Sequence, residues 1–597
     1  MLGLGLRVYK LDVRGLKYDN EAAYYFSPKT TALLLTWLSD RSFEGPGFSS
    51  ETRTDVIQFL ETRHVFPISN YYYKPLYHAL LSAFYLVVPN AGYNGLLYWS
   101  ALFGSATVLT MFLLARQLWE DELAALAAAL FMAASGYHII WSRSGYAQTA
   151  AMFVFCLTLI AYLSSLRFPD GRSKRFLGWV TGFGLGATFA IHPSSVPYLL
   201  VVGFVAIYAF LKQGKWRALA RQMIPLLGGA LICLVIVEAS LTYFLVVLGD
   251  NLSWLFTDDR PFMTFFEQLW KVRHRSLSPS GFFYGFRSKI SAYGIQPFLY
   301  GEGLVVSALA VVGTAMVARR WWKGRRPEEL LVLFGLGFPF LFYFVFASKL
   351  PYPRNVAYVS IFVALSGGIA AAEAIRRWRL GSFVLALALA AFFLIQGAHI
   401  GYLYRVRSGY KDAAHWLRER GEKAIVTHRR PALWEAHGTK AYLPLARNHT
   451  NDRNAIYLKR WGQTRRVELL DLPLYYATSE TQYRKPERLA FMATYLPGQN
   501  PVAVFPNTDP FTAKRMELLD LALKVCTNLA LPCPADRVRR EREISEEVIW
   551  NNSIKLYRLP TNGAKAHSWT LPILETKLAF PGKTGYVERR VVQQSLS

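Results

Sequence analysis

The chain has 597 residues, of which 53% are hydrophobic, 15% aromatic and 18% charged. About a quarter of the residues of a soluble protein are usually charged, so this composition argues against a set of ordinary soluble domains. The formal net charge is +27, but the lysines and arginines lie in clusters between long apolar runs and form no arginine-rich arm, which favours a membrane topology signal over nucleic-acid binding.

Residues 1–93 form the first predicted region. The opening stretch "MLGLGLRVYKLD" is apolar but too short to cross a bilayer, so we expect it to be the tail of a first, truncated span. The segment 20–93 carries helical patterning in "TALLLTWLSD" and "DVIQFLETRH", broken by "EGPG". This pattern predicts an outer-face loop with short amphipathic helices that lie along the membrane interface.

Residues 94–400 form the second predicted region, a transmembrane helical domain of about ten spans. The predicted spans are 94–117, 123–140, 148–168, 180–191, 196–211, 223–248, 298–318, 330–347, 355–373 and 383–400. The fourth span is short, and the sequence "HPSSVP" that follows it is typical of a broken helix.

The loops between these spans give an orientation. The loops 167–179, 212–222, 318–329 and 373–382 carry 4, 4, 5 and 3 lysines and arginines, whereas the hairpins 141–147 and 348–354 carry 1 and 2. The positive-inside rule places the rich loops in the cytoplasm. The first region, the two poor hairpins, the loop 249–297 and the tail 401–597 are then expected on the outer side.

Residues 401–597 form the third predicted region, a soluble extracytoplasmic α/β domain. The sequence predicts a helix over "KDAAHWLRERG" that ends at Gly421, a strand over "KAIVTH", a strand over "NPVAVFPN", a capped helix over "DPFTAKRMELLDLALKVC" and a strand over "NSIKLYRLP". Cys526 and Cys533 flank "TNLALP", and they would form a small disulfide if this domain faces an oxidising compartment.

Two carboxylates in "GLKYDNEAAYYF", Asp19 and Glu21, are the candidate catalytic residues. Such residues often serve only as a helix cap and a solvated first turn. Beside lipid, however, a carboxylate gains a raised pKa and can act as a general base or bind a divalent metal. The sequence therefore offers a base or metal ligand here and leaves the metal requirement open.

Four basic residues are candidate ligands of a phosphate. Lys74 lies in "YYYKPLYHALL", directly after Tyr73; Arg143 lies in "WSRSGYAQTAAMF"; Lys349 and Arg354 lie in "SKLPYPRNVAYV". Each could simply anchor its helix end among lipid headgroups. Together, on one outer face, they would form an anion site, and arginine offers a bidentate fork for phosphate.

His192, Tyr73 and Gln148 are further candidate residues of the same region. His192 lies at the predicted helix break in "AIHPSS", where a histidine is often structural. Two acids, Glu238 and Glu302, lie inside or at the edge of long apolar runs, and acids at that depth are more typical of transporters.

Four stretches of the chain, in their order, resemble a membrane family. They are "YDNEAAYY", "YYYKPLYHALLSAFYLVVPNAGYNGLLYWSALFGSATVLTMFLLARQLW", "ALAAALFMAASGYHIIWSRSGYAQTAAMFVF" and "KLPYPRNVAYVSIFVAL". The chain is similar to the GT-C fold glycosyltransferases of the protein O-mannosyltransferase and aminoarabinose transferase superfamily. The likeness implies a polytopic α-helical, GT-C-like membrane protein with a C-terminal extracytoplasmic α/β domain.

The resemblance also implies a function in the cytoplasmic membrane. A sugar would move from a polyprenyl-phosphate carrier to a lipid, glycan or protein acceptor on the outer face, with inversion at the anomeric carbon. Asp19 would then activate the acceptor or contact a metal, and Lys74, Arg143 and Arg354 would face the lipid-linked phosphate.

The chain departs from the family pattern at several points. Asn20 separates the two acids, Leu76 replaces a second proline, Gln148 stands where many members have an acidic residue or a tyrosine, and Tyr73 stands where the aminoarabinose enzymes have a glutamate that can bind metal. These departures leave metal dependence and the identity of the sugar open. The alternative function is a transporter or flippase of lipid-linked sugars, which would show internal repeats and ionisable residues at mid-membrane.

Overall fold

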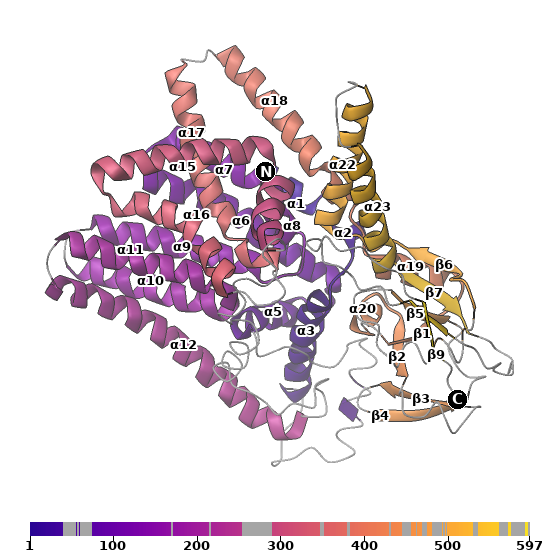
Figure 1. The fold of residues 1–597 in the computed structure, drawn as a ribbon. Helices are drawn as coiled ribbons and strands as arrows, with labels where there is room; N and C mark the ends of the chain where they lie inside the picture. The colour runs from indigo at the N-terminus through magenta and orange to yellow at the C-terminus, as the bar shows by residue number, and fades with distance from the viewer. Residues whose placement is uncertain are drawn as a thin grey trace. The chain divides into compact units, whose positions relative to one another are not determined.

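The computed structural model describes residues 1–39, 55–56, 59, 74–168, 171–213, 216–252, 289–346, 352–378, 382–428, 431–444, 455–460, 463–468, 475–479, 492, 496, 498–528, 535–559, 571–574 and 591–594. The chain folds as two compact units (Figure 1). The membrane unit comprises Met1–Leu11, Asn70–Asp250 and Arg260–Tyr404, and the sheet unit comprises Asp12–Ser69, Asn251–Asp259 and Arg405–Ser597.

All secondary-structure elements in the described part of the membrane unit are helices or helical turns. Its elements are α1 (Leu2–Val8), α5 (Pro75–Val87), α6 (Tyr93–Trp119), α7 (Glu122–Ala134), α8 (Gly136–Ser142), α9 (Gln148–Arg167), α10 (Arg172–Ile191), η2 (Pro193–Ser195), α11 (Val196–Gln213), α12 (Trp216–Leu252), η5 (Ser291–Glu302), α15 (Leu304–Gly324), α16 (Pro327–Phe346), η6 (Pro353–Val356), α17 (Val359–Arg377), α18 (Ser382–Ile400) and η7 (Gly401–Arg405).

Eight helices among the described residues are long and apolar enough to cross a membrane. These stretches are Tyr93–Trp119, Gln148–Arg167, Pro193–Lys212, Met223–Leu241, Leu304–Gly324, Pro327–Phe346, Val359–Arg377 and Phe383–Arg405. The bent pair α7 and α8 would be a ninth span if the two helices cross together. The chain is therefore a multi-pass membrane protein, and the predicted polytopic helical fold with a C-terminal α/β domain is confirmed.

Helices α7 and α8 meet at a bend of 56°. Specific hydrogen bonds satisfy the backbone groups that the bend leaves without helical partners. Ser135 caps α8, because its Oγ accepts from the backbone N–H of His138 at 3.0 Å. The buried Arg7 donates to the carbonyl oxygens of Met132 and Ala133 at 3.1 and 3.2 Å. Carbonyls freed by the break thus find a donor inside the protein, as a lipid environment requires.

Helix α10 differs in length from the predicted span 180–191. It runs for 20 residues and begins with the basic sequence Arg172–Arg175, so it is not among the eight apolar helices of the described residues. It ends at Ile191, and the single 3₁₀ turn Pro193–Ser195 leads into α11. The predicted break at "HPSSVP" is therefore present.

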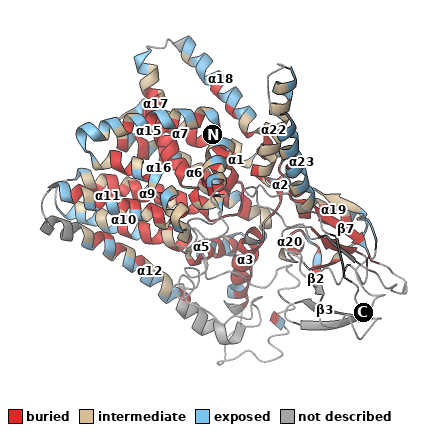
Figure 2. Cartoon of the chain, in the orientation of Figure 1, coloured by how far each residue is buried: buried red, intermediate tan, exposed pale blue. Residues whose placement is uncertain are grey.

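Burial separates central from peripheral helices in the membrane unit (Figure 2). Residues Val359–Ala370 of α17 are all buried. Helix α18, by contrast, exposes large apolar side chains, among them Leu387, Leu394 and Ile395. Exposed apolar faces of this kind are expected where a helix meets lipid.

The sheet unit contains a seven-stranded mixed sheet in the order β4-β3-β2-β1-β5-β7-β6. The strands are β1 (Ala424–Thr427), β2 (Lys440–Pro444), β3 (Ala455–Arg460), β4 (Gln463–Glu468), β5 (Tyr475–Thr478), β6 (Ala503–Phe505) and β7 (Ile554–Arg558), with β8 (Leu571–Leu574) and β9 (Val591–Gln594) as a separate pair. Strand β1 pairs in parallel with β2 and β5, and the remaining pairs are antiparallel.

Helices α2 (Leu11–Arg14), α3 (Asp19–Ser39), α19 (Gly409–Glu419), α20 (Pro431–Ala436), α22 (Pro510–Asn528) and α23 (Ala535–Asn552) complete the described part of this unit. The sequence predicts short interfacial helices after residue 20, whereas residues 19–39 form one helix of 21 residues. Hydrogen bonds join the N-terminal segment to the later chain: Ser408 N–H donates to the Arg14 carbonyl at 2.8 Å, and His437 Nε2–H donates to the Leu16 carbonyl at 3.0 Å.

The predicted disulfide is partly visible in the described residues. Cys526 is disulfide-bonded, whereas Cys533 lies outside the described residues. Cys156 and Cys233 are free and buried in the membrane unit, where a thiol packs like a small apolar side chain.

Candidate active site

Lys74 begins helix α5 in the membrane unit. Pro75 occupies the first helical position, where its missing N–H costs nothing, and Lys74 is the N-cap residue with only 5% of its surface exposed. Burial, together with the nearby charge of Arg354, holds the pKa of Lys74 well below its usual range. Lys74 and Arg354, which the sequence predicted as phosphate ligands, therefore act on each other in the structure.

Arg354 lies on the short turn η6 and is held by aromatic side chains. Its Nη1 donates to the Tyr146 hydroxyl at 3.1 Å, and its guanidinium lies 5.2 Å from the Tyr146 ring centroid and 4.5 Å from that of Tyr352. Within the described residues, no carboxylate pairs with Arg354. The rings of Tyr146 and Tyr352 therefore hold the guanidinium in place without neutralising its positive charge.

His192 is the third basic residue of this group. It is the C-cap of α10, is buried, and its Nδ1 hydrogen-bonds with the Ser194 hydroxyl. Burial lowers the pKa of His192 well below its usual range, and the charges of Lys74 and Arg354 lower it further. Three residues far apart in sequence thus act on one another electrostatically. We call Lys74, His192 and Arg354 the basic cluster.

A histidine that the sequence reasoning missed extends this region. His78 lies one helical turn after Lys74, is fully buried, and has a pKa lowered to about 3 by burial and by the Lys74 charge. The spacing of four residues on a helix that starts at Lys74 was the signal that could have identified it. Tyr146, three residues after the predicted Arg143, was likewise missed.

Gln148 is the first residue of α9 and is fully buried. Neither Oε1 nor Nε2 of its amide has a hydrogen-bond partner among the described residues. A buried amide without partners is costly, and such groups commonly mark a place for water or a ligand. Next to it, Thr149 Oγ1 hydrogen-bonds with Ser100 Oγ at 2.9 Å.

Arg143 occupies a different environment from the basic cluster. Its Nη1 donates to the carbonyl oxygens of Arg7 and Tyr9 at 3.1 and 2.6 Å, and its Nη2 donates to that of Lys10 at 3.3 Å. Its guanidinium also lies over the Tyr404 ring. These carbonyls end helix α1, so Arg143 anchors the N-terminal helix, and a phosphate would compete with them for its N–H groups.

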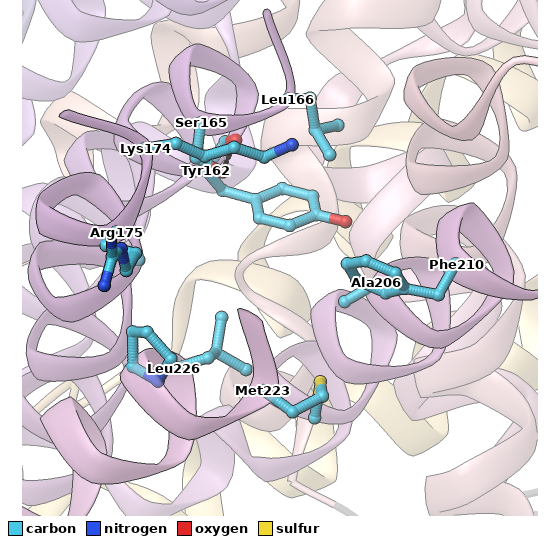
Figure 3. A pocket seen from close by; sticks show the side chains of 11 residues that line it. Tyr162, Ser165, Leu166, Lys174, Arg175, Ala206, Phe210, Met223 and Leu226 are labelled. Atoms are coloured by element: carbon cyan, nitrogen blue, oxygen red, sulfur yellow. Dashed lines mark hydrogen bonds between the residues drawn. The ribbon is translucent and has the colours of Figure 1, made fainter. Parts of the chain in front are cut away.

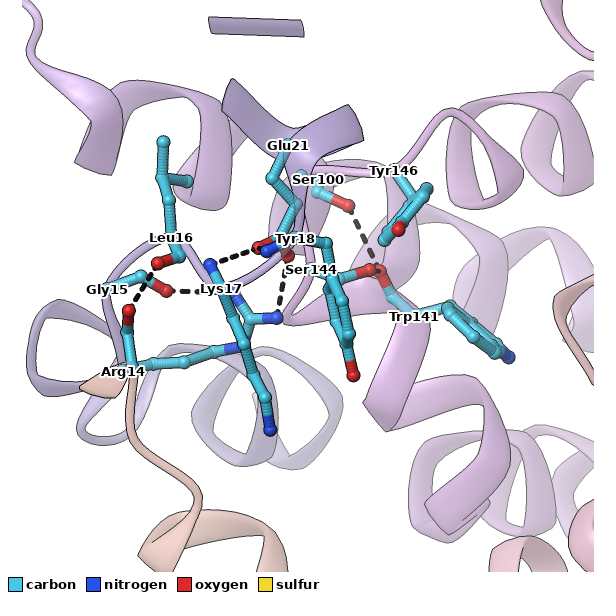
Figure 4. Close-up of polar contacts among 12 residues, drawn as sticks. Arg14, Gly15, Leu16, Lys17, Tyr18, Glu21, Ser100, Trp141, Ser144 and Tyr146 are labelled. Carbon is cyan, nitrogen blue, oxygen red and sulfur yellow. Dashed lines mark hydrogen bonds and ion pairs between the residues drawn. The ribbon is translucent and has the colours of Figure 1, made fainter. Parts of the chain in front are cut away.

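Glu21 belongs to the sheet unit, where both carboxylate oxygens are engaged (Figure 4). Oε1 accepts from Arg14 Nη2 at 2.6 Å, and Oε2 accepts from the backbone N–H groups of Lys17 and Tyr18 at 2.6 and 3.1 Å. Glu21 is fully buried, and the Arg14 side chain is 6% exposed. The carboxylate thus joins the loop 14–18 to the first turn of α3.

The other predicted site residues lie beyond what the structure describes in detail. Asp19 begins α3, and only its backbone is described. Lys349 and Tyr73 lie outside the described residues. Among the described residues there is no group of three or more histidine, cysteine, aspartate and glutamate side chains that could hold a metal ion.

Comparison with known proteins supports the resemblance seen in the sequence. Residues 73–243 match the family model described as dolichyl-phosphate-mannose-protein mannosyltransferase. The undecaprenyl phosphate-alpha-4-amino-4-deoxy-L-arabinose arabinosyl transferase of Pseudomonas aeruginosa (strain LESB58) is 34% identical over 170 residues, which are 25% of this chain and 30% of the relative. The chain thus spans less than a third of the length of this curated relative, and the predicted resemblance to the superfamily is confirmed for that stretch.

Two solved structures show low sequence identity to the chain. ArnT from Cupriavidus metallidurans bound to undecaprenyl phosphate has a TM-score of 0.45 and 15% identity, and the match covers 73% of each chain. The archaeal oligosaccharyltransferase AglB from Archaeoglobus fulgidus, in complex with an inhibitory peptide and a dolichol-phosphate, has a TM-score of 0.46 and 12% identity over 94% of this chain and 87% of that one.

Proposed function

We propose that this chain is a membrane glycosyltransferase that takes a sugar from a polyprenyl-phosphate carrier and transfers it to a lipid, glycan or protein acceptor. The observation that carries the proposal is the basic cluster, in which Lys74 and Arg354 act on each other electrostatically and Arg354 is held by the aromatic side chains of Tyr146 and Tyr352. Lys74 and His192 lie within the stretch that matches the mannosyltransferase model. The relative's name, which includes undecaprenyl phosphate, supports a polyprenyl-phosphate donor.

The chemistry of sugar transfer suits this cluster. When the glycosidic bond to phosphate breaks, negative charge develops on the leaving phosphate. Fixed cations in a site with little water stabilise that charge strongly, because they need no reorganisation during the reaction. Arg354 offers a planar fork for two phosphate oxygens, and Lys74 offers a second basic group at the N-cap of α5.

His192 and Gln148 complete the proposed donor site. The His192 ring adds hydrogen-bonding capacity beside Lys74 and Arg354, and the Gln148 amide would donate to or accept from the carrier phosphate or the sugar. On the resemblance alone, Asp19 is proposed as the base that activates the acceptor, which would invert the anomeric carbon. Arg143 remains a predicted phosphate contact, and so do Lys349 and Tyr73 as residues of this site.

We also propose that the protein resides in the cytoplasmic membrane with its tail outside. The four loops rich in lysine and arginine support this orientation through the positive-inside rule. The disulfide at Cys526 supports an oxidising compartment for residues 401–597.

The test is sugar transfer from radiolabelled polyprenyl-phosphate sugars by the full chain in detergent, with mass spectrometry of envelope lipids and glycans to identify the product. Arg354→Ala is expected to lower kcat by roughly 10²–10³, as for the loss of one donor to a developing oxyanion. The matched control is Arg319→Ala, an exposed arginine on α15. Unchanged transfer by Arg354→Ala and by Lys74→Ala would exclude the proposed donor site. Movement of the intact lipid across vesicles without transfer would instead favour a flippase.

A further inference from the structure

A pocket lies in the membrane unit between helices α9, α10, α11 and α12 (Figure 3). The empty space among its lining residues measures about 430 Å³ and is partly open to solvent. Its lining combines two cations, Lys174 and Arg175, with the apolar side chains of Leu166, Phe210, Met223 and Leu226. The pocket therefore offers positive charge at one side and hydrocarbon at another.

This pocket is separate from the basic cluster. His192, a member of the basic cluster, is the C-cap of α10, and Arg175 near the other end of the same helix lines the pocket. A helix rises 1.5 Å per residue, so these two positions are roughly 25 Å apart along α10. The pocket lies at the ends of the helices that are joined by the loops 167–179 and 212–222, each of which carries 4 lysines and arginines.

A buried polar atom points to a ligand in this pocket. Tyr162 is 3% exposed, and its hydroxyl has no hydrogen-bond partner among the described residues. Figure 3 shows the Tyr162 ring extending into the space between the helices, with Arg175 on one side and Phe210 on the other. A phenol oxygen that is kept from water and from protein partners is costly unless a ligand or a water molecule bonds to it.

The charges around the pocket favour an anion. Arg175 has no carboxylate partner in the described part of the chain. The carboxylate of Glu328 acts electrostatically on Tyr162, but it does not line the pocket. Both lining cations and the tyrosine hydroxyl are donors that suit phosphate oxygens.

The surroundings favour a lipid as the source of that phosphate. Ile224 and Leu227, which neighbour the lining residues on α12, are 63% and 60% exposed, and Phe176 next to Arg175 is 67% exposed. These apolar side chains provide a surface for acyl chains beside the cationic pocket. Basic pockets between membrane helices on the side with the positive loops are a recurrent way of holding anionic headgroups.

We propose that the pocket between α9, α10, α11 and α12 binds the phosphate headgroup of an anionic membrane phospholipid, with its acyl chains along the exposed face of α12. This site is independent of the sugar-transfer site proposed above. It would fix the ends of four helices on the side with the basic loops.

Native mass spectrometry of the full chain in detergent tests the proposal with phosphatidylglycerol, phosphatidylcholine and inorganic phosphate as probes. Lys174→Gln/Arg175→Gln is expected to weaken phosphatidylglycerol binding by about tenfold to thirtyfold, the combined effect of two cations near an anionic lipid. The matched control, Arg172→Gln/Lys323→Gln, removes two charges that do not line the pocket. Equal losses in the two double variants would overturn the site and indicate only a general charge effect.

Two further variants separate a built site from a charged surface. Tyr162→Phe keeps the net charge and the ring, and it is expected to weaken phosphatidylglycerol binding several-fold. Glu328→Gln removes the nearby negative charge and is expected to strengthen it. Unchanged binding in Tyr162→Phe would overturn the role of the hydroxyl and with it the proposed site. Binding of inorganic phosphate without preference for phosphatidylglycerol over phosphatidylcholine would overturn the lipid as the occupant.

Discussion

Nη1 of Arg354 donates a hydrogen bond to the Tyr146 hydroxyl over 3.1 Å, although 208 positions separate the two residues in the chain. The tyrosine lies in the hairpin between α8 and α9, and the arginine lies on η6. Tyr146 thus orients Arg354, the cation that is proposed to stabilise the leaving phosphate.

Tyr146→Phe removes the hydroxyl but keeps the ring beneath the guanidinium. We expect kcat for sugar transfer to fall by about tenfold, because a misplaced cation stabilises the leaving phosphate less well. Tyr146→Ala should cost more, since it also removes the cation–π contact. Steady-state kinetics checks both variants, and equal kcat values for Tyr146→Phe and the wild type would contradict a positioning role.

Arg143→Met tests whether Arg143 anchors helix α1 or binds the carrier phosphate. Its guanidinium donates to the carbonyls of Arg7, Tyr9 and Lys10. Removing it leaves these carbonyls without their donor, so we expect a loss of about 1–3 kcal/mol in stability, seen as a lower Tm in detergent. Arg116→Met, which removes an arginine that is 57% exposed, is the control. An unchanged Tm with a lower kcat would assign Arg143 to the phosphate instead.

Glu21→Gln breaks the buried ion pair with Arg14. Because Arg14 then remains buried without its carboxylate, we expect a loss of about 3–5 kcal/mol in the stability of the sheet unit. Chemical unfolding monitored by limited proteolysis checks this, with Glu419→Gln as the control because Glu419 is 57% exposed. If Glu21 acted as a catalytic base, the variant would keep its stability and lose only kcat.

Because His437 is buried with a lowered pKa, we expect the sheet unit to become less stable in acid. Burial lowers the pKa of His437 from 6.5 to about 4, so the unfolded chain binds a proton there more readily than the folded chain does. Stability should therefore fall as the pH drops from about 6.5 towards 4, by up to about 3 kcal/mol from this group.

His437→Gln keeps a donor for the Leu16 carbonyl but does not titrate. In unfolding experiments at a series of pH values, this variant should lose much of the acid sensitivity between pH 6.5 and 4, and the exposed His415→Gln should not. Identical pH profiles of stability for His437→Gln and the wild type would contradict the role of His437 in the acid sensitivity of the sheet unit.

Gly182→Ala tests the close approach of α10 and α12. A Cβ at Gly182 would lie 2.1 Å from the Leu226 carbonyl oxygen, which is backbone and cannot turn aside. We expect the helices to separate at a cost of about 1–3 kcal/mol, measured as a lower Tm. Gly203→Ala on α11, where nothing lies within 4 Å, should leave the Tm unchanged or raise it.

The long apolar runs and the local turn signals made much of the fold predictable. The predicted strand over "KAIVTH" corresponds to β1, and the helix cap before "PFTAKRM" is present, because Asp509 Oδ1 accepts from the N–H groups of Phe511 and Thr512. Gly421 has the positive φ of +78° that ends α19. Each of these features depends on neighbours within a few residues.

Features that depend on distant partners could not be predicted. Nothing in the sequence around Arg143 indicates that the carbonyls of α1 bind its guanidinium. Lys74 and Arg354 are basic, as Arg143 is, yet only packing determines that they act on one another while Arg143 anchors a helix. The pairing of Glu21 with Arg14 is closer in sequence, but its burial follows from the fold of the whole sheet unit.

The contrast between α17 and α18 determines how the membrane unit responds to bilayers of different thickness. Helix α17 is enclosed on all sides over Val359–Ala370, so its tilt is fixed by its neighbours. Helix α18 exposes Leu387, Leu394 and Ile395 and can incline to match its apolar length to the hydrocarbon layer. In a thinner membrane, hydrophobic mismatch would therefore be taken up first by α18, while the central helices keep their arrangement.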